Sequence, residues 1–173
     1  MQYRRLFVCV EGPDDERFVA RIVKPVLEKK YDLVQVVQYA EQKKEKFNNL
    51  LRSFRKMGDY LCLADMNDKP CTTATKQAIQ GTFKDIDTDR IVVVIKEIEG
   101  WYLAGLDEVG CKQLRIPAHD TTDHIAKEDF DRLIPKRFDS RIDFMSEILK
   151  FFSLEIAKQK NRSFGYFLEK HDC

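Results

Sequence analysis

The stretch LFVCVEGPDDE at residues 6–16 joins a short apolar run to an abrupt acidic turn. Its first half is typical of a buried β-strand, and Gly12 and Pro13 then break the run. The acidic residues 14–16 suit the first turn of a helix, where carboxylates interact favourably with the helix dipole. Apolar residues then recur at spacings of three and four as far as Leu27, with Pro25 expected to bend or end the helix. The stretch therefore predicts the first strand and helix of an α/β fold.

The same alternation of strand and helix continues along the chain. We expect strands at residues 3–10, 33–39, 59–63 and 90–95, and helices at 14–27, 43–57, 72–79, 98–106, 128–133, 141–152 and 163–170. Gly58 is expected to cap the second helix and Gly81 to stop the third. The stretch 107–126, which contains Pro117, is expected to be irregular.

This order predicts an α/β, Rossmann-like sandwich with a central, mainly parallel sheet of four strands, followed by a helical C-terminal extension. A chain of 173 residues suits one domain. We expect that domain to span residues 1–173, with a core at about 1–107 and the extension at about 108–173.

Acidic residues follow three of the apolar runs. They are Glu11 and Asp15, then Asp65 and Asp68, then Glu97 and Glu99. Right-handed crossovers place the carboxyl ends of parallel strands on one side of the sheet, where ligands of such folds bind. Carboxylates gathered there would repel one another without a cation, and Mg²⁺ or Mn²⁺ prefers oxygen ligands. We therefore predict a site for one or two divalent ions.

Each acidic cluster also has an ordinary structural interpretation. Residues 14–16 can simply stabilise a helix N-terminus, and residues 65–68 have the composition of an Asx-turn. Glu97 and Glu99 can belong to the first helical turn ahead of Trp101. Lys96, beside them, is the candidate for stabilising negative charge that develops in a reaction.

Three segments resemble the Toprim domain, the catalytic domain of topoisomerases, primases, small ribonucleases and OLD-type nucleases. VEGPDDERF at residues 10–18 resembles the opening of OLD-type and small standalone Toprim proteins. IKEIEGWYL at 95–103 resembles a Glu-x-Glu-aromatic signature of the standalone group, and NRSFGYF at 161–167 resembles the end of those proteins.

The resemblance implies a Mg²⁺-dependent phosphoryl-transfer site in a Toprim-like fold. Carried over by position, Glu11 would be the general acid/base or a metal ligand, and Asp65 a metal ligand. Asp15 would take the acidic position on the first helix, and Glu97 or Glu99 would complete the site. The implied activity is that of a hydrolase, a metal-dependent nuclease acting on nucleic acid.

The sequence departs from the family pattern after the third strand. The usual Asp-x-Asp would place a carboxylate at position 67, but this chain has Asn67, with Asp68 one residue later. An amide oxygen still binds hard cations, though it brings no charge. The missing carboxylate weakens the expectation of a second metal ion and, with it, the expectation that the domain cleaves its substrate.

The net charge of +1 does not itself predict a nucleic-acid partner, but local charge is uneven. Residues 41–56 sum to +4 and residues 150–170 to +3. Both segments are also compatible with a solvated helix face. We expect Lys158, Lys160 and Arg162 to hold a nucleic-acid backbone. The neighbouring aromatic side chains at 164, 166 and 167 fit a core more readily than a base-stacking surface.

The cysteines and the apolar stretches indicate the cellular compartment of the protein. None of the five cysteines forms a Cys-x-x-Cys pair, which argues against a zinc knuckle and suits a reducing compartment. The start of the chain leads straight into a strand, and no apolar stretch reaches transmembrane length. We therefore expect a cytoplasmic protein without membrane contact, which as a defence or repair nuclease would need a partner ATPase or another subunit. The sequence predicts no oligomeric state.

Two other functions stay open. A Toprim-like module with a degraded metal site would bind nucleic acid or protein without cleavage, and Asn67 is its main support. A receiver-like phosphoacceptor domain would use residues 14–15 as its acidic pair, with Asp65 and Lys96. Against the receiver, Glu11-Gly12-Pro13 separates the first strand from the acidic pair, and no clear fifth strand follows.

Overall fold

The structure is a computed structural model that describes residues 3–171. It contains a sheet of four parallel strands in the order β2-β1-β3-β4. The chain divides into two compact units, Met1–Val93 and Val94–Cys173. The predicted α/β class and its four-stranded parallel sheet are confirmed.

The strands are short and lie close to their predicted positions. They are β1 (Arg5–Val10), β2 (Leu33–Gln38), β3 (Asp59–Asp65) and β4 (Ile91–Val94). β1 occupies the interior of the sheet, with Arg5 opposite Leu33 of β2 and Leu6 opposite Asp59 of β3. β3 extends two residues beyond its predicted end, so that Asp65 is its last residue.

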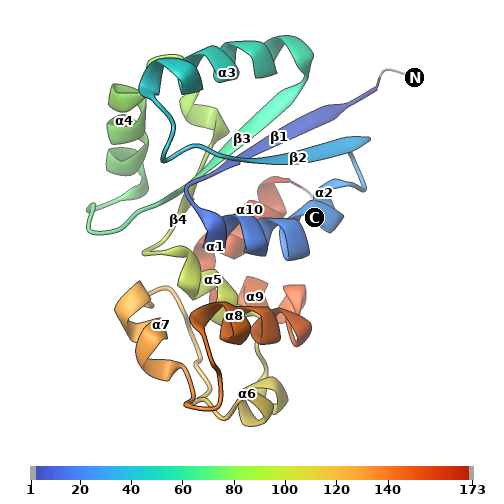
Figure 1. The fold of residues 1–173 in the computed structure, drawn as a ribbon, viewed down its shortest axis with the longest axis vertical. Coiled ribbons are helices and arrows are strands. Elements are labelled where there is room, and N and C mark those ends of the chain that lie inside the picture. Colours follow the sequence, from blue (N-terminus) through green and yellow to red (C-terminus); the bar gives the residue numbers. More distant parts are fainter. Residues whose placement is uncertain (1–2, 172–173) are drawn as a thin grey trace. The chain divides into compact units, whose positions relative to one another are not determined.

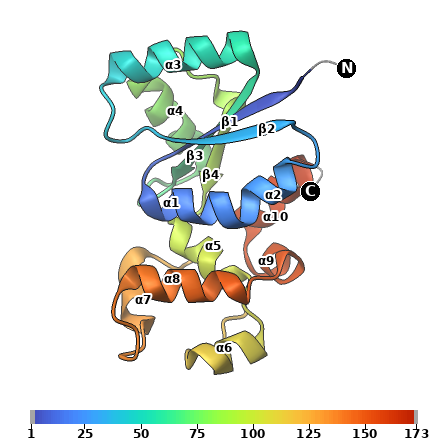
Figure 2. The ribbon, with the colours of Figure 1, turned by 45° about the vertical axis from the view of Figure 1, so that its right-hand side comes forward.

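Helices cover both faces of the sheet in the first unit (Figures 1 and 2). α3 (Lys44–Met57) and α4 (Thr72–Thr82) lie on one face, and α1 (Pro13–Phe18) with α2 (Lys24–Leu27) lies on the other. A π-helical turn, η1 (Val19–Val23), joins α1 to α2 directly ahead of Pro25. Because proline has no N–H to donate and its ring crowds the preceding turn, this change of helical geometry falls where the sequence predicts a bend. A short 3-10 turn, η2 (Thr88–Arg90), precedes β4.

The core of the first unit follows the twofold alternation of side chains along each strand. Phe7 and Cys9 of β1 pack with the buried face of α3, which consists of Phe47, Leu51 and Phe54. Phe7 stacks on Phe54 with ring centroids 4.1 Å apart. The buried residues Leu6, Val8 and Val10 alternate with these and point to the opposite face.

One glycine prediction is confirmed and one is wrong. Gly58 caps α3, because its backbone N–H donates a hydrogen bond of 2.9 Å to the Phe54 carbonyl, and its φ of 169° is extended. It is needed for space, because a Cβ there would lie 2.5 Å from the carbonyl oxygen of Arg5. Gly81 does not stop the third helix, because α4 continues to Thr82 and nothing lies near Gly81 to force a break.

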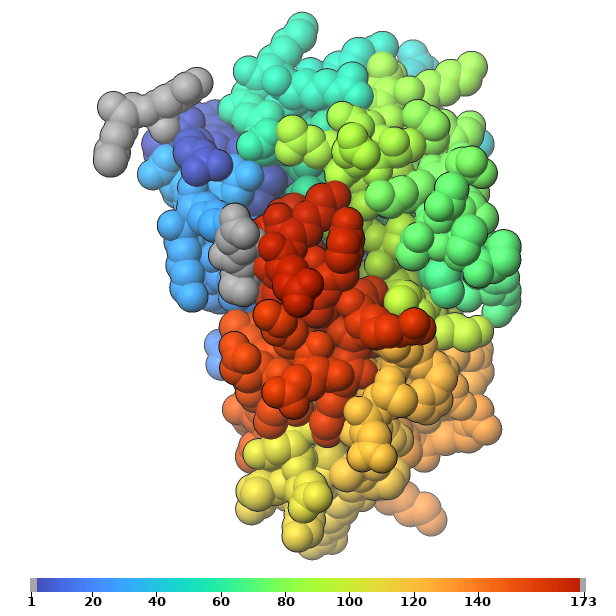
Figure 3. Space-filling model, turned by 180° about the vertical axis from the view of Figure 1, so that it is seen from behind, coloured from blue at the N-terminus to red at the C-terminus, as the bar shows by residue number. Residues whose placement is uncertain are grey.

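The second unit begins with the last residue of β4 and is otherwise helical, and Figure 3 shows its side chains in yellow-green to red. Its helices are α5 (Ile98–Ala104), α6 (Glu108–Leu114), α7 (Lys127–Leu133), α8 (Arg141–Lys150), α9 (Leu154–Lys160) and α10 (Arg162–Lys170). The prediction that residues 107–126 are irregular is wrong for α6, and α9 was also missed. Both begin at a side-chain cap, Asp107 for α6 and Ser153 for α9.

Trp101 of α5 is fully buried at the centre of this unit. It packs edge-on against Phe164 and close to Phe167, with ring centroids 4.9 Å and 5.8 Å away. The interpretation of these two phenylalanines as core residues is confirmed, whereas Tyr166 is 64% exposed. Within residues 3–171, no helix combines the length and apolar character needed to cross a bilayer.

Candidate functional site

Glu11 and Asp65 lie side by side at the carboxyl edge of the sheet. Glu11 directly follows β1, and Asp65 ends the neighbouring strand β3. The Oε1 atom of Glu11 accepts a hydrogen bond of 3.2 Å from the Asp65 backbone N–H. Both residues are half-buried. Parallel pairing thus brings together two carboxylates that are 54 residues apart in the chain.

Both acids line a cavity of about 320 Å³ between the strand ends and α4. Asn67 and Lys69 from the turn after β3 also line it, and Thr75 and Ile79 are among its α4 residues. The cavity therefore offers two carboxylates, one amide and one ammonium group beside an apolar wall. Lys69 is a member that the sequence did not single out, because no motif distinguishes it from the other lysines of the chain.

Tyr39 was also missed, although it contacts Glu11 directly. It follows β2, is 6% exposed, and donates a hydrogen bond of 3.0 Å to the Leu63 carbonyl. Its hydroxyl also lies 3.5 Å from Glu11 Oε1. Burial raises the pKa of Tyr39 well above its ordinary value, and the negative charge of Glu11 raises it further. The hydroxyl consequently stays protonated and acts as a donor. The sequence signal for Tyr39 is an aromatic residue at the end of a predicted strand.

The turn after β3 explains why position 67 is an asparagine. Asn67 has a φ of 51°, in the left-handed region that asparagine tolerates better than most residues. Its Nδ2 group donates a hydrogen bond of 3.2 Å to the Asp65 carbonyl. An aspartate at this position would place an acceptor against an acceptor. The amide therefore stabilises the turn that positions Asp65, while its side chain still lines the cavity.

Two further predicted ligands differ in their placement. Asp15, on the first turn of α1, is 7% exposed, and its charge contributes to the raised pKa of Tyr39. It therefore lies near Glu11 and Tyr39. Asp68 is exposed and does not line the cavity, although the residues on either side of it do.

The chemistry of Glu11 and Asp65 fits a magnesium ion. Among residues 3–171, no group of three or more His, Cys, Asp or Glu side chains is arranged to hold a metal. Protein-bound Mg²⁺ does not require such a group, since it keeps several waters and is often held by one or two carboxylates together with substrate phosphate oxygens. Glu11 and Asp65 supply two such carboxylates, and the Asn67 amide oxygen is a neutral donor of the same class.

Lys96, Glu97 and Glu99 belong to the second unit. Lys96 is half-buried and has a φ of 58°. Glu97 accepts a hydrogen bond through Oε2 from the backbone N–H of Lys127, the first residue of α7. Glu99 is 4% exposed and forms an ion pair with Arg141. Each glutamate therefore has a structural partner within its own unit. Burial raises the pKa of Glu99, and the Arg141 guanidinium opposes this effect.

The three basic residues predicted to hold nucleic acid also have partners in this unit. Lys160 donates a hydrogen bond of 2.7 Å to the Leu106 carbonyl, and Arg162 pairs with Asp123 at 2.6 Å. Lys158 is exposed and lies 3.7 Å from Glu169. Lys160 and Arg162 thus stabilise the ends of helices and loops, which leaves Lys158 as the least constrained of the three.

Comparison of the chain with models of known protein families, with curated proteins and with solved structures gives no match. The likeness to the Toprim domain therefore rests on the three sequence segments and stays a prediction.

Proposed function

We propose that this protein is a Toprim-like domain that carries out Mg²⁺-dependent phosphodiester cleavage on nucleic acid in the cytoplasm. The observation that carries the proposal is the contact between Glu11 and the end of β3, which places two carboxylates in one cavity at the carboxyl edge of a parallel sheet. This is the edge at which open α/β folds bind their ligands.

In this proposal Glu11 and Asp65 hold the cation, with Asn67 as a neutral oxygen donor and Asp15 adding negative charge nearby. A bound divalent ion would stabilise negative charge on phosphoryl oxygens and lower the pKa of an attacking water. The Tyr39 hydroxyl lies 3.5 Å from the Glu11 carboxylate, and Lys69 places a positive charge beside the same cavity. Lys96, Glu97 and Glu99 belong to the second unit, and their role stays a prediction from the resemblance.

The proposal is tested by cleavage of labelled single- and double-stranded DNA and RNA with Mg²⁺ or Mn²⁺. Loss of a carboxylate that holds the metal removes charge stabilisation, and we expect Glu11→Gln and Asp65→Asn each to reduce the rate about 100-fold or more. Glu45→Gln, which neutralises an exposed acid on α3, is the matched control and should keep the wild-type rate.

Calorimetry of Mn²⁺ binding to the same variants tests the metal site separately from cleavage. Weakened Mn²⁺ binding in both site variants but not in Glu45→Gln supports the metal centre. Cleavage that survives Glu11→Gln contradicts the proposal.

A second candidate is the non-catalytic module. It is favoured by Asn67, which brings no charge where the family pattern has a carboxylate, and by the finding that no group of three or more His, Cys, Asp or Glu side chains in residues 3–171 is arranged to hold a metal. Such a module would bind Mn²⁺ weakly, and it would bind nucleic acid without cleaving it. The receiver-like alternative has less support, because receivers have five parallel strands and the described residues contain four.

A further inference from the structure

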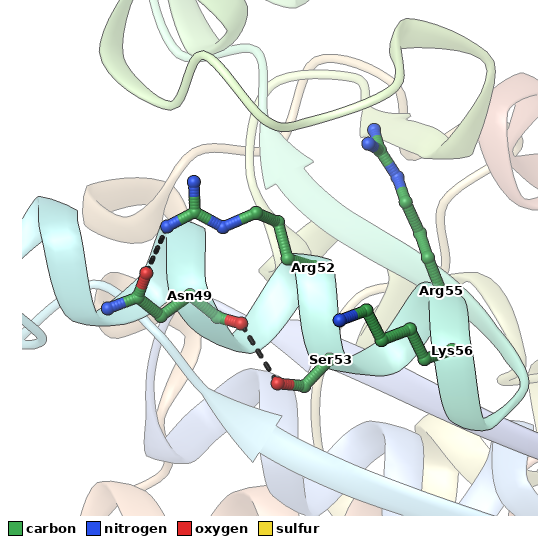
Figure 4. Close-up of a pocket in the computed structure, with 5 residues that line it drawn as sticks. All are labelled: Asn49, Arg52, Ser53, Arg55 and Lys56. Carbon is green, nitrogen blue, oxygen red and sulfur yellow. Dashed lines mark hydrogen bonds between the residues drawn. The ribbon is translucent and has the colours of Figure 1, made fainter.

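Two adjoining hollows lie at the amino edge of the sheet, where β1 and β3 begin. The first measures about 500 Å³ and is lined by Asn49, Arg52, Ser53, Arg55 and Lys56 of α3 (Figure 4). The second, of about 350 Å³, shares Arg55 and Lys56 and adds Arg4 and Arg5 from the start of β1. We call the five basic residues Arg4, Arg5, Arg52, Arg55 and Lys56 the basic surface. All five are exposed.

Little negative charge opposes the basic surface. Among the described residues that line the two hollows, Asp59 is the one acid, and it lies 3.2 Å from Arg90. Arg52, which is exposed, approaches the half-buried Asp85 at 3.6 Å, a separation at which a surface pair contributes little. Arg55 donates to the uncharged carbonyl oxygen of Asp85 at 2.5 Å. The surface therefore keeps a clear excess of positive charge.

The donor groups suit a chain of phosphates. In Figure 4 the guanidinium groups of Arg52 and Arg55 extend from α3 on the same side of the helix. Ser53 lies between them and Asn49 one turn before them, and both add neutral polar groups. Arginine and lysine together with such neutral side chains make most protein contacts to nucleic-acid backbones. Tyr3 is 58% exposed in the second hollow, and the guanidinium of Arg5 lies over its ring at 5.3 Å, so an arginine–aromatic pair adds to the surface.

The helix dipole explains only part of this arrangement. Basic residues in the last turn of a helix interact favourably with its unpaired carbonyls, which accounts for Arg55 and Lys56. It does not account for Arg5, the first residue of β1, for Arg4 just before it, or for Arg52, which precedes the last turn of α3. Two separate elements therefore deliver positive charge to the same pair of hollows.

We propose that the basic surface binds the phosphate backbone of nucleic acid, at the edge of the sheet opposite Glu11 and Asp65. A row of concave hollows that runs from a helix to a strand fits a chain of phosphates, whereas a flat lipid surface would contact only protruding side chains. This binding requires no metal and no cleavage, so it goes beyond the proposed function and stands without it.

The test uses fluorescence anisotropy of labelled single-stranded DNA, measured with EDTA so that no divalent ion contributes. We compare the full chain with the triple variant R52Q/R55Q/K56Q. The matched control K43Q/K44Q/K46Q removes the same charge from exposed residues at the other end of α3. At moderate salt we expect the basic-surface variant to bind about tenfold more weakly or worse. The slope of log Kd against log salt should fall by about two, since each lost phosphate contact removes roughly 0.7 from the slope for single strands.

The control variant should bind within about twofold of the unaltered chain. Equal weakening by both triple variants would indicate that only the overall charge matters and would overturn the proposal, as would unchanged binding in both. Preferential binding of the unaltered chain to phosphatidylserine vesicles over DNA would also overturn it. Thermal melting by circular dichroism verifies that each variant is folded, and the EDTA in the assay keeps the result independent of the metal centre.

Discussion

Glu99 carries the clearest electrostatic consequence at the scale of single residues. Its carboxylate is 4% exposed and is held against the guanidinium of Arg141, which also lies over the ring of Phe130 at 5.0 Å. Desolvation is the largest influence on its pKa and raises it, while Arg141 limits the effect. Burial of such a carboxylate without its partner would leave an uncompensated charge, which is strongly destabilising.

The raised pKa of Glu99 predicts a specific pH dependence. Because the folded state binds this proton more tightly than the unfolded state, the stabilisation is present below the ordinary pKa of 4.5 and is lost as pH rises through the folded pKa. Glu99→Gln cannot titrate. The unfolding free energy of the unaltered protein minus that of Glu99→Gln should therefore fall as pH rises above 4.5. Urea unfolding at a series of pH values measures this difference. Glu147→Gln, on α8, is the control, and a difference that rises with pH would contradict the assignment.

At the scale of elements, the contact between α3 and β1 depends on Gly58. A Cβ at this position would lie 2.5 Å from the Arg5 carbonyl oxygen and 2.9 Å from the Arg5 Cβ, so backbone has to move to accommodate a methyl group. We expect Gly58→Ala to destabilise the protein by about 1–3 kcal/mol, as overpacking usually does. Gly81→Ala, where nothing lies within 4 Å, should leave stability unchanged or raise it by up to about 1 kcal/mol. Chemical denaturation measures both, and equal effects of the two substitutions would refute the close-approach explanation.

The elements also show which features local sequence predicts. Long amphipathic segments such as α3 carry a strong periodic signal, and unbroken β-branched runs such as β4 are typical of buried strands. The predicted bounds of both are within a residue or two. α6 and α9 have seven residues each and begin at side-chain caps. Length alone does not explain why they were missed, because α5 and α7 have the same length and were predicted. The π-helical turn of η1 adjusts the geometry ahead of Pro25 without changing the apolar pattern.

In the candidate site, too, the sequence predicts some residues and misses others. Glu11 and Asp65 follow from the strand ends and the parallel order, which are readable along the chain. The Tyr39 hydroxyl reaches Glu11 across 28 residues, and such a contact depends on packing rather than on any local pattern. Asn67 reads as a departure from the family pattern until its left-handed backbone and its hydrogen bond to Asp65 are seen.

At the scale of the whole molecule, the sheet order predicts how local stability is distributed. β1 and β3 are interior strands, and almost all of their residues are buried. β2 is an edge strand in which one residue of six is buried. Because interior, fully packed strands open only in large unfolding events, backbone amides of β1 and β3 should exchange most slowly. Hydrogen exchange followed by mass spectrometry checks this order, and equally slow exchange in β2 would contradict it.

The parallel sheet also sets a length scale for any bound nucleic acid. Arg5 and Glu11 stand at opposite ends of β1, and six residues of extended strand span about 20 Å. Phosphates along one strand of duplex DNA recur about every 3.4 Å, so this span corresponds to about six nucleotides. An oligonucleotide of only three or four nucleotides can occupy the amino edge or the carboxyl edge, but not both. If both proposals hold, a very short oligonucleotide would inhibit binding when it occupies the amino edge and cleavage when it occupies the carboxyl edge. A longer oligonucleotide would occupy both edges and inhibit both at once.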